Sequence, residues 1–411
     1  MSRKLSQTSP LPDVKAALVP RLRFPEFSTR GEWEKKSVGT YLVDCSGRVA
    51  SDTELPIYSS TREGLKRQDA YFDGNVLQNT NDYGIVPAEC FVYRHMSDDG
   101  LFKFNINSTG DDIAVSKEYP VFRTRGLNSR FLLAQLNEGL DFKRFAYSQK
   151  TGGTRTRLYF SRLREWQTPL PSTGEQQKIA DCLSSLDELI AAQARKVDAL
   201  KTHKIGLMQQ LFPREGETQP HLRLPEFREA AKWNSENLGN IAENLDSRRV
   251  PITSSDRVAG EVPYYGASGI VDYVAEFIFD EDLLCISEDG ANLTARTYPI
   301  AFPISGKTWV NNHAHVLRFK NAFTQKFVEV YLNAIKLDDF ITGMAQPKLN
   351  RGMLDSIPIP VPGIAEQQRI ADCLTSLDTL INAATQELET LKTHKKGLMQ
   401  QLFPAAEEVV A

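Results

Sequence analysis

One short motif in the chain has the residue types that bind phosphate. Residues 301–308 read AFPISGKT, in which Gly306, Lys307 and Thr308 satisfy a loose phosphate-binding loop pattern. Such a loop needs a strand before it and a helix that opens at the lysine and threonine, so that amide N–H groups converge on the phosphate. Here the strand-like WVNNHAHVL follows, and Pro303 interrupts the loop. We therefore predict no nucleotide site.

A pair of histidines offers metal-ligating nitrogens. His313 and His315 alternate along one predicted strand, but no cysteine or carboxylate is placed nearby in the sequence to complete a site. We therefore expect ordinary hydrogen bonds and no bound metal. The two halves of the chain share no Ser-His-Asp set or acidic pair, and no GxGxxG or [ND]PP[YF] motif occurs. The chain is predicted to be non-catalytic.

Nucleic-acid binding is the chemistry that the sequence does support. Residues 141–170 carry seven Lys/Arg against two acids, and aromatic residues are interleaved among them: Phe142, Phe145, Tyr147, Tyr159, Phe160 and Trp166. Cations beside aromatics suit a surface that follows a nucleic-acid backbone, although a solvated charged face would have the same composition. The counterpart at 332–357 is neutral, so any DNA role there must rest on Gln346, Lys348, Asn350 and Arg351.

Direct readout of bases needs side-chain amides and forked donors, with Arg to guanine and Asn or Gln to adenine. Residues of these types occur on predicted loops and polar strand ends in both halves of the chain. In the first half the candidates are Ser60, Thr61, Arg62, Thr154, Arg155 and Arg157. In the second half they are Ser268, Asn311, Asn312, His313, Gln346 and Lys348.

The elements that would position these residues are written twice. Residues 171–213 return as 362–404 at a constant offset of 191, and PRLRFPEFSTRGEW at 20–33 returns as PHLRLPEFREAAKW at 220–233. Each unit is therefore a prefix, a variable body and a repeated block. Repeats of about 200 residues indicate duplicated domains rather than a solenoid.

Each repeated block is predicted to be one long helix. Prolines precede each start and follow each end, and apolar residues recur at three- and four-residue steps. The predicted seam consists of Ile179, Leu186, Ile190, Leu200, Leu207, Ile370, Leu377, Ile381, Leu391 and Leu398. Two equal seams suit an antiparallel helix pair, although each helix could instead pack only on its own body.

The sequence thus predicts a mixed α and β protein, in which two globular domains are joined by two long antiparallel coiled-coil helices in a pseudo-twofold repeat. We divide the chain into a disordered leader at 1–19, a first globular domain at 20–170, a first spacer helix at 171–213, a linker at 214–219, a second globular domain at 220–361, a second spacer helix at 362–404 and a tail at 405–411.

Composition restricts the remaining classes. The net charge of −3 tells against a free-standing basic DNA binder, so partners would supply part of the positive field. The five scattered cysteines favour free thiols in a reducing cytoplasm. Neither a run of eighteen apolar residues nor a secretory signal is present, so we expect a cytoplasmic protein without a membrane partner.

The order of these parts resembles the specificity subunit of type I restriction–modification systems. The resemblance is carried by EQQKIADCLSSLDELI and EQQRIADCLTSLDTLI with their LMQQLFP ends, by the two prefixes, and by the PLPSTGEQ and PVPGIAEQ segments before each helix. These motifs cover the chain from about residue 20 to residue 404.

The resemblance implies two target recognition domains, each reading half of a split, asymmetric sequence in double-stranded DNA, at a distance set by the helices. It also implies two methyltransferase subunits and two restriction subunits as partners. S-adenosylmethionine, ATP and Mg are then expected on the partners, and no cofactor on this chain. The alternatives are an adaptor whose domains bind protein or glycan, a silent decayed copy, and an enzyme.

Overall fold

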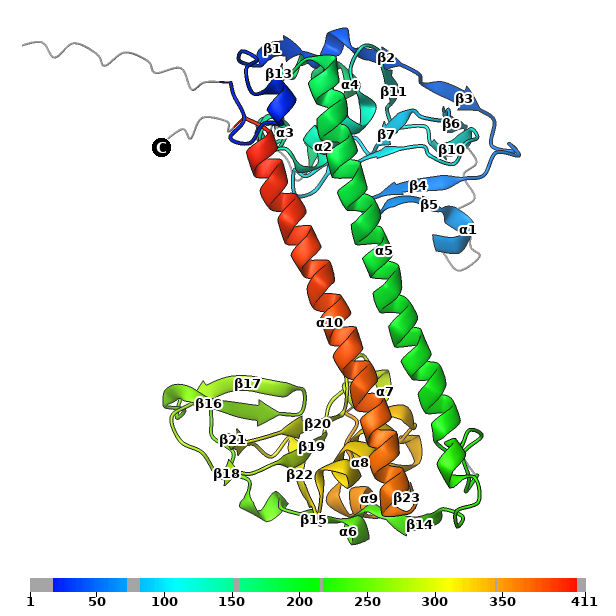
Figure 1. Ribbon diagram of the computed structural model, residues 1–411, viewed down its shortest axis with the longest axis vertical. Helices are drawn as coiled ribbons and strands as arrows, with labels where there is room; N and C mark the ends of the chain where they lie inside the picture. The colour runs from blue at the N-terminus through cyan, green and yellow to red at the C-terminus, as the bar shows by residue number, and fades with distance from the viewer. Residues whose placement is uncertain (1–17, 72–81, 151–154, 215–216, 344–345, 405–411) are drawn as a thin grey trace, which may run out of the picture. The chain divides into compact units, whose positions relative to one another are not determined.

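The computed structural model describes residues 18–71, 82–150, 155–214, 217–343 and 346–404 (Figure 1). The chain combines helices and sheets, as the sequence predicts, and divides into two compact units. The first unit consists of Met1–Gln193 and Glu387–Ala411, and the second of Ala194–Gln386.

The first unit is built around a four-stranded antiparallel sheet. Its order is β2 (Leu42–Asp44), β11 (Val121–Thr124), β7 (Phe91–Tyr93) and β9 (Phe104–Ile106). A second sheet is formed by β10 (Ile113–Ser116), β6 (Tyr83–Val86) and β3 (Gly47–Val49). The first unit also contains three separate two-stranded sheets. They pair β1 (Glu34–Ser37) with β13 (Gln167–Leu170), β4 (Tyr58–Thr61) with β5 (Gly64–Arg67), and β8 (Met96–Ser97) with β12 (Thr156–Arg157). The helices are α1 (Gln68–Tyr71), α2 (Ser129–Glu138), α3 (Leu140–Ser148) and α4 (Phe160–Glu165).

The second unit repeats this plan with a different sequence. Its main sheet has the order β15 (Ala242–Asn244), β22 (Ala314–Phe319), β19 (Leu283–Ser287) and β20 (Ala301–Ile304), and all its pairs are antiparallel. The second sheet contains β17 (Gly269–Val274), β16 (Ala259–Gly266), β21 (Lys307–Val310) and β18 (Phe279–Asp280). β14 (Asn234–Asn237) pairs with β23 (Pro358–Val361). The helices are α6 (Leu238–Ile241), α7 (Asn292–Ala295), α8 (Ala322–Ala334) and α9 (Arg351–Asp355), and Asp246–Arg248 forms the 3₁₀ turn η4.

Local signals explain several of these elements. Asn128 and Asn321 cap α2 and α8, because each side chain accepts a hydrogen bond from the amide N–H three residues later. The SGKT motif joins β20 to β21, so Lys307 opens a strand and not a helix, as the sequence predicts.

The two repeated blocks are the long helices α5 (Thr173–Leu211) and α10 (Ile364–Leu402), each of 39 residues. In the first unit, Ile179 and Leu183 of α5 belong to the same core as Met399 and Leu402 of α10. Further along α5 and nearer the start of α10, Gln193 donates to Glu387 at 2.8 Å. Residues early in α5 therefore contact residues late in α10, and residues later in α5 contact residues earlier in α10. The two helices run antiparallel within this unit (Figure 1).

The second unit contains the other ends of the same two helices. Leu211 of α5 shares a core with Ile370 and Leu374 of α10, and Lys204 bonds Asp378. The pairing is therefore antiparallel here as well. Each unit is closed by the start of one repeated helix and the end of the other.

A buried ion pair explains why the prefix is repeated together with the helix. In the first unit Arg23 donates from Nε and Nη2 to the two carboxylate oxygens of Glu175, both at 2.7 Å. In the second unit Arg223 binds Glu366 in the same way, at 2.9 and 2.7 Å. Both glutamates are at most 3% exposed, so each prefix is fixed to the first turn of a long helix.

The helix ends are joined to the prefixes by equivalent backbone bonds. The Leu22 amide donates to the Gln401 carbonyl, and the Leu222 amide donates to the Gln210 carbonyl, both at 2.9 Å. No helix in the described part of the chain has the length and apolarity that crossing a membrane requires. Apart from residues 18 and 19, the expected leader and the tail lie outside the described residues.

Candidate nucleic-acid interface

The structure brings two candidate segments of the first unit to one turn. Arg62, after β4, donates from Nη2 to both carboxylate oxygens of Asp99, at 2.8 and 2.7 Å. Arg155, before β12, donates from Nε to Asp98 Oδ1 at 2.8 Å. Because Asp98 and Asp99 are adjacent, both arginines are held at the same turn. Their side chains remain 62% and 51% exposed, which leaves them accessible to a phosphate.

Asp99 is held in its charged form. The Ser97 hydroxyl, the Leu101 amide and the Arg62 guanidinium all donate to its carboxylate, and together they lower the pKa of Asp99 to about 2. The carboxylate is therefore ionised throughout the neutral range. It competes with any phosphate for Arg62.

A cavity beside Arg62 extends the positive surface. It has a volume of about 200 Å³, and its lining includes Lys103 and Lys143 but no carboxylate. Burial lowers the pKa of Lys103, because the charged ammonium is poorly solvated there. A phosphate group would offset that loss of solvation, so this side of the first unit suits an anionic ligand.

The other first-unit candidates differ in availability. Arg157 is exposed on β12, whereas Thr154 lies outside the described residues. Ser60 accepts a hydrogen bond from Asn105 Nδ2 at 2.9 Å, and the Thr61 hydroxyl donates to the Gly64 carbonyl at 2.9 Å. Both side chains therefore shape the β4–β5 hairpin.

The aromatics of the basic stretch are only partly on the surface. Phe142 and Trp166 are at most 2% exposed and belong to the core of the first unit, so their assignment to a DNA-binding surface is wrong. Tyr147 and Tyr159 are 65% and 53% exposed and remain available to stack on bases. The sequence pattern alone could not separate the buried aromatics from the exposed ones, because their burial depends on how helices α3 and α4 pack against the rest of the unit.

Candidates of the second unit also converge, on residues 287–290. Ser268 is exposed in the two-residue turn between β16 and β17, and the Ala267 carbonyl of this turn accepts a hydrogen bond from the Ser287 hydroxyl. His313 Nδ1 lies 2.7 Å from Asp289 Oδ2, and Lys348 Nζ lies 3.2 Å from Glu288 Oε1. Three segments that are distant in the sequence therefore meet at this turn.

Closely similar four-residue motifs are contacted by both groups of candidates. Residues 97–100 read SDDG and residues 287–290 read SEDG, and we call them the acidic turns. Gly100 and Gly290 have φ angles of 78° and 108°, which favour glycine. The motif recurs at an offset of 190, so a comparison of the two halves could have identified it, although it was not among the predicted features.

Asn311 is not an interface residue. It is 7% exposed, and its Oδ1 accepts the His313 amide at 2.8 Å, so it shapes the turn before β22. The assignment of Asn311 to DNA contacts is therefore wrong, because a buried side chain cannot reach a groove. Asn312 and Gln346 are exposed and keep their side chains available.

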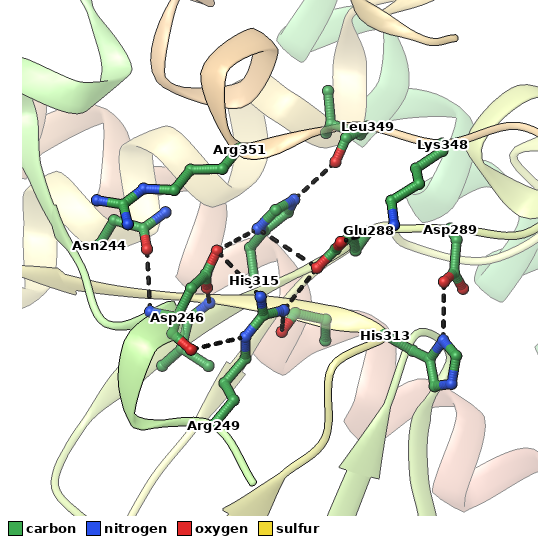
Figure 2. Close-up of polar contacts among 12 residues, drawn as sticks. Asn244, Asp246, Arg249, Glu288, Asp289, His313, His315, Lys348, Leu349 and Arg351 are labelled. Carbon is green, nitrogen blue, oxygen red and sulfur yellow. Dashed lines mark hydrogen bonds and ion pairs between the residues drawn. The ribbon is translucent and has the colours of Figure 1, made fainter. Parts of the chain in front are cut away.

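His315 lies in a buried network of charges (Figure 2). Its Nδ1 is 2.6 Å from Asp246 Oδ2, its Nε2 is 2.7 Å from the Leu349 carbonyl, and the side chain is 1% exposed. Ordinary hydrogen bonding was expected, but the expectation that no carboxylate lies nearby was wrong. Asp246 and Glu288 approach from η4 and from the acidic turn, which are far away in the sequence.

Arg249 occupies the position at which a metal ion would contact the carboxylates of this network. Ligand atoms of Asp246, Glu288 and His315 lie within 4.8 Å of one another, a spacing that could hold a metal ion. Arg249, however, donates to Glu288 Oε2 at 2.6 Å and lies 3.4 Å from Asp246 Oδ2. The guanidinium supplies the positive charge that a metal would supply, so the arrangement fits a self-contained ion network better than a cation site.

Both carboxylates of the network are ionised. Burial by itself raises the pKa of Asp246, but hydrogen bonds from His315 and the Val316 amide lower it overall. Burial likewise raises the pKa of Glu288, but the hydrogen bonds from Arg249 and Lys348 and the neighbouring charges together lower it overall. The network therefore carries real charges and needs its cations.

The predicted seam residues lie along α5 and α10, and all ten are buried or half-buried. Several residues that are at most 6% exposed on the same helices were not among the predicted seam: Ala180, Leu183, Ala371, Leu374 and Met399. They lie beside the predicted seam positions, and Ala180, Leu183, Leu374 and Met399 belong to the cores of the two units. The helices therefore have a broader apolar face than a two-helix seam requires.

A family model supports a common origin for both halves. The model described as Type I restriction modification DNA specificity domain matches residues 75–202 and 231–393. Over 143 residues the chain is 36% identical to a Haemophilus influenzae protein provisionally named as a type I restriction enzyme specificity subunit, which covers 35% of this chain and 37% of that relative. Over 342 residues it is 26% identical to a Methanocaldococcus jannaschii protein provisionally named the MjaX specificity subunit, which covers 76% of this chain and 79% of that relative.

Solved structures show the same fold. The S subunit of a type I restriction–modification system from M. genitalium aligns with a TM-score of 0.60 at 16% identity, over 94% of this chain and all of that one. A chain from a study of complex assembly and conformational transition of the type I system aligns with a TM-score of 0.53 at 13% identity, over 91% of this chain and 98% of that one.

Proposed function

Since the chain belongs to the type I restriction–modification DNA specificity family, we propose that it is the sequence-specific DNA-recognition subunit of a type I restriction–modification complex. Each unit reads one half of a bipartite, asymmetric target. The paired helices hold the units and offer docking surfaces to the other subunits.

One observation carries this proposal: the same helix-anchored body occurs twice, with different polar residues over the same acidic turn. Arg62 and Arg155 lie over the first turn, whereas His313 and Lys348 lie over the second. A shared frame with different side chains at one place is what reading two different half-sites needs, because base identity is read by particular donors and acceptors.

The chain itself is proposed to be non-catalytic and to bind no cofactor. Two methyltransferase subunits, with S-adenosylmethionine, would carry out adenine-N6 methylation, and two restriction subunits, with ATP and Mg, would translocate and cleave DNA. The net charge of −3 supports this division, because the partners then supply much of the DNA clamp. We place the complex in the cytoplasm, where it meets the chromosome.

Methylome sequencing tests the proposal. A host without the system is given this chain together with its methyltransferase partner, and control hosts receive either gene alone. We expect one new bipartite adenine-methylated motif only when both are present. If the assembled complex yields no new motif, the chain is an adaptor or a silent copy. Binding of S-adenosylmethionine or ATP by the purified chain alone would instead favour the enzyme alternative.

A further inference from the structure

A buried side chain helps to fix the main chain between two of the exposed candidates of the second unit, in addition to the backbone hydrogen bonds between Lys348 and Thr342. His315 Nε2 lies 2.7 Å from the carbonyl oxygen of Leu349, and the Leu349 amide donates to the Glu288 carbonyl at 2.8 Å. The Leu349 side chain is fully buried. Lys348 precedes Leu349 and Asn350 follows it, and both are exposed. The position of the Leu349 peptide therefore determines where its two neighbours point.

Both ring nitrogens of His315 lie against oxygen atoms. The Leu349 carbonyl has no proton to give, so Nε2 must donate to it. Nδ1 lies 2.6 Å from Asp246 Oδ2, and the other oxygen of Asp246 accepts the Val316 amide. The ring therefore holds β22, η4 and the segment at 346–350 together.

Two carboxylates face this ring and a guanidinium. Asp246 contacts both His315 and Arg249, and Glu288 is paired with Arg249. All four side chains are at most 13% exposed. Lys348 lies at the edge of the same group and is 47% exposed (Figure 2). Its ammonium group can therefore leave Glu288 and bind an acceptor on DNA instead.

We propose that His315 is a positioning residue for base reading by the second unit. Its hydrogen bonds to Leu349 and Asp246 help to fix the backbone that presents Lys348 and Asn350 beside the acidic turn that His313 contacts, although His315 itself is too deeply buried to touch DNA. Discrimination between bases needs donors held within about 0.5 Å of their working geometry, so a loosened Leu349 peptide costs specificity first. This inference rests on the proposed function of the chain.

His315→Gln tests the positioning role. The new amide can still donate to the Leu349 carbonyl, but its oxygen faces the Asp246 carboxylate, so one hydrogen bond becomes a repulsion. With the methyltransferase partner present, we expect methylation to spread to sites altered in the second half-site. The preference for the cognate second half-site should fall by about tenfold or more, as for the loss of one specific base contact. The first half-site and the gap should remain unchanged.

A second substitution provides the rescue. Adding Asp246→Asn to His315→Gln replaces the histidine–carboxylate pair by two amides. The asparagine can donate to the glutamine oxygen while its own oxygen still accepts the Val316 amide, and Glu288 with Arg249 remains balanced. We expect most of the discrimination to return in the double variant, which a role in stability alone does not predict.

Val316→Ala is the matched control. Val316 is fully buried on the same strand, and its side chain packs into a separate apolar cluster. It should lower the stability of the second unit without relaxing the second half-site. A folded His315→Gln variant that discriminates like the wild type would overturn the inference. So would a Val316→Ala variant that relaxes the half-site equally, or a double variant that shows no recovery.

Amide hydrogen exchange separates this inference from the proposed function. Exchange at the Leu349 amide should accelerate in His315→Gln, measured on the full chain, whether or not the complex methylates DNA. If the wild type directs no methylation but this amide is released in the variant, the function is wrong and the fixing of the segment stands. If the amide keeps its protection, the inference fails even when the function is right.

Discussion

Asp98 holds Arg155 at the surface, and substituting it should strengthen DNA binding. In the free protein the Arg155 guanidinium is paired with Asp98 at 2.8 Å, and the two side chains are 51% and 71% exposed. To bind a phosphate, Arg155 must leave this carboxylate. An exposed ion pair contributes about 0.2–1 kcal/mol. Asp98→Asn removes that cost, so affinity should rise by about 1.4- to 5-fold.

The measurement is fluorescence anisotropy with the assembled methyltransferase complex, at several salt concentrations. The gain should be similar for target and non-target DNA, because a phosphate contact carries no sequence information.

The opposite change is the removal of Arg155 and Arg157 together. It should lower the slope of log K against log[salt] by about 1.8, at about 0.9 for each lost phosphate contact, and abolish recognition of the first half-site.

Glu165→Gln is the matched control for Asp98→Asn. Glu165 pairs with Arg162 at 2.8 Å in the same unit, and both side chains are 58% exposed. The control should leave the affinity unchanged. If Asp98→Asn also leaves affinity and salt dependence unchanged, Arg155 does not contact DNA. If it weakens binding, the carboxylate itself touches the DNA, and the reasoning about competition is refuted.

Three further predictions concern the scaffold. Glu175→Gln should lower the stability of the first unit by about 3 kcal/mol, measured by urea unfolding, because it leaves a buried guanidinium without its counter-charge. A fragment ending at Pro213 should homodimerise, as measured by light scattering, and with its partners should direct methylation to a palindrome of the first half-site. A folded monomer would contradict it. Insertion of one heptad after Ala192 and another after Ala383 should lengthen the helix pair by about 10 Å and widen the methylated gap by about three base pairs; an unchanged gap would show that the helices do not set the spacing.

The elements with local signals were the ones that the sequence could predict. The repeated blocks at 171–213 and 362–404 are the helices Thr173–Leu211 and Ile364–Leu402, because flanking prolines and apolar periodicity are both written along the chain. The mixed composition of the bodies was also predictable. Pairing of strands such as β15 with β22 was not, because it joins residues about 75 positions apart without a turn signal.

The residues that were misassigned share one cause. Asn311, Phe142 and Trp166 have types that suit a DNA surface, but the tertiary fold turns them inward. His315 lacked acidic neighbours in the sequence and has two in space. Residue type is local information, whereas burial depends on long-range packing. Candidates chosen from sequence alone therefore include both residues that could contact bases and buried residues that only position them.

The differences between the two helices explain how a duplicated pair can stay within one chain. Lys204 bonds Asp378 in the second unit, and Lys395 bonds Asp187 in the first, at positions that correspond through the offset of 191. These matched contacts would form equally well between two copies of one half. The Gln193–Glu387 bond is different, because the corresponding positions are Ala384 and Lys196, which cannot form the same pair. Matched ion pairs thus make the helices compatible with their own duplicates, and an unmatched polar contact favours the heterologous pair, as single polar residues do in coiled coils.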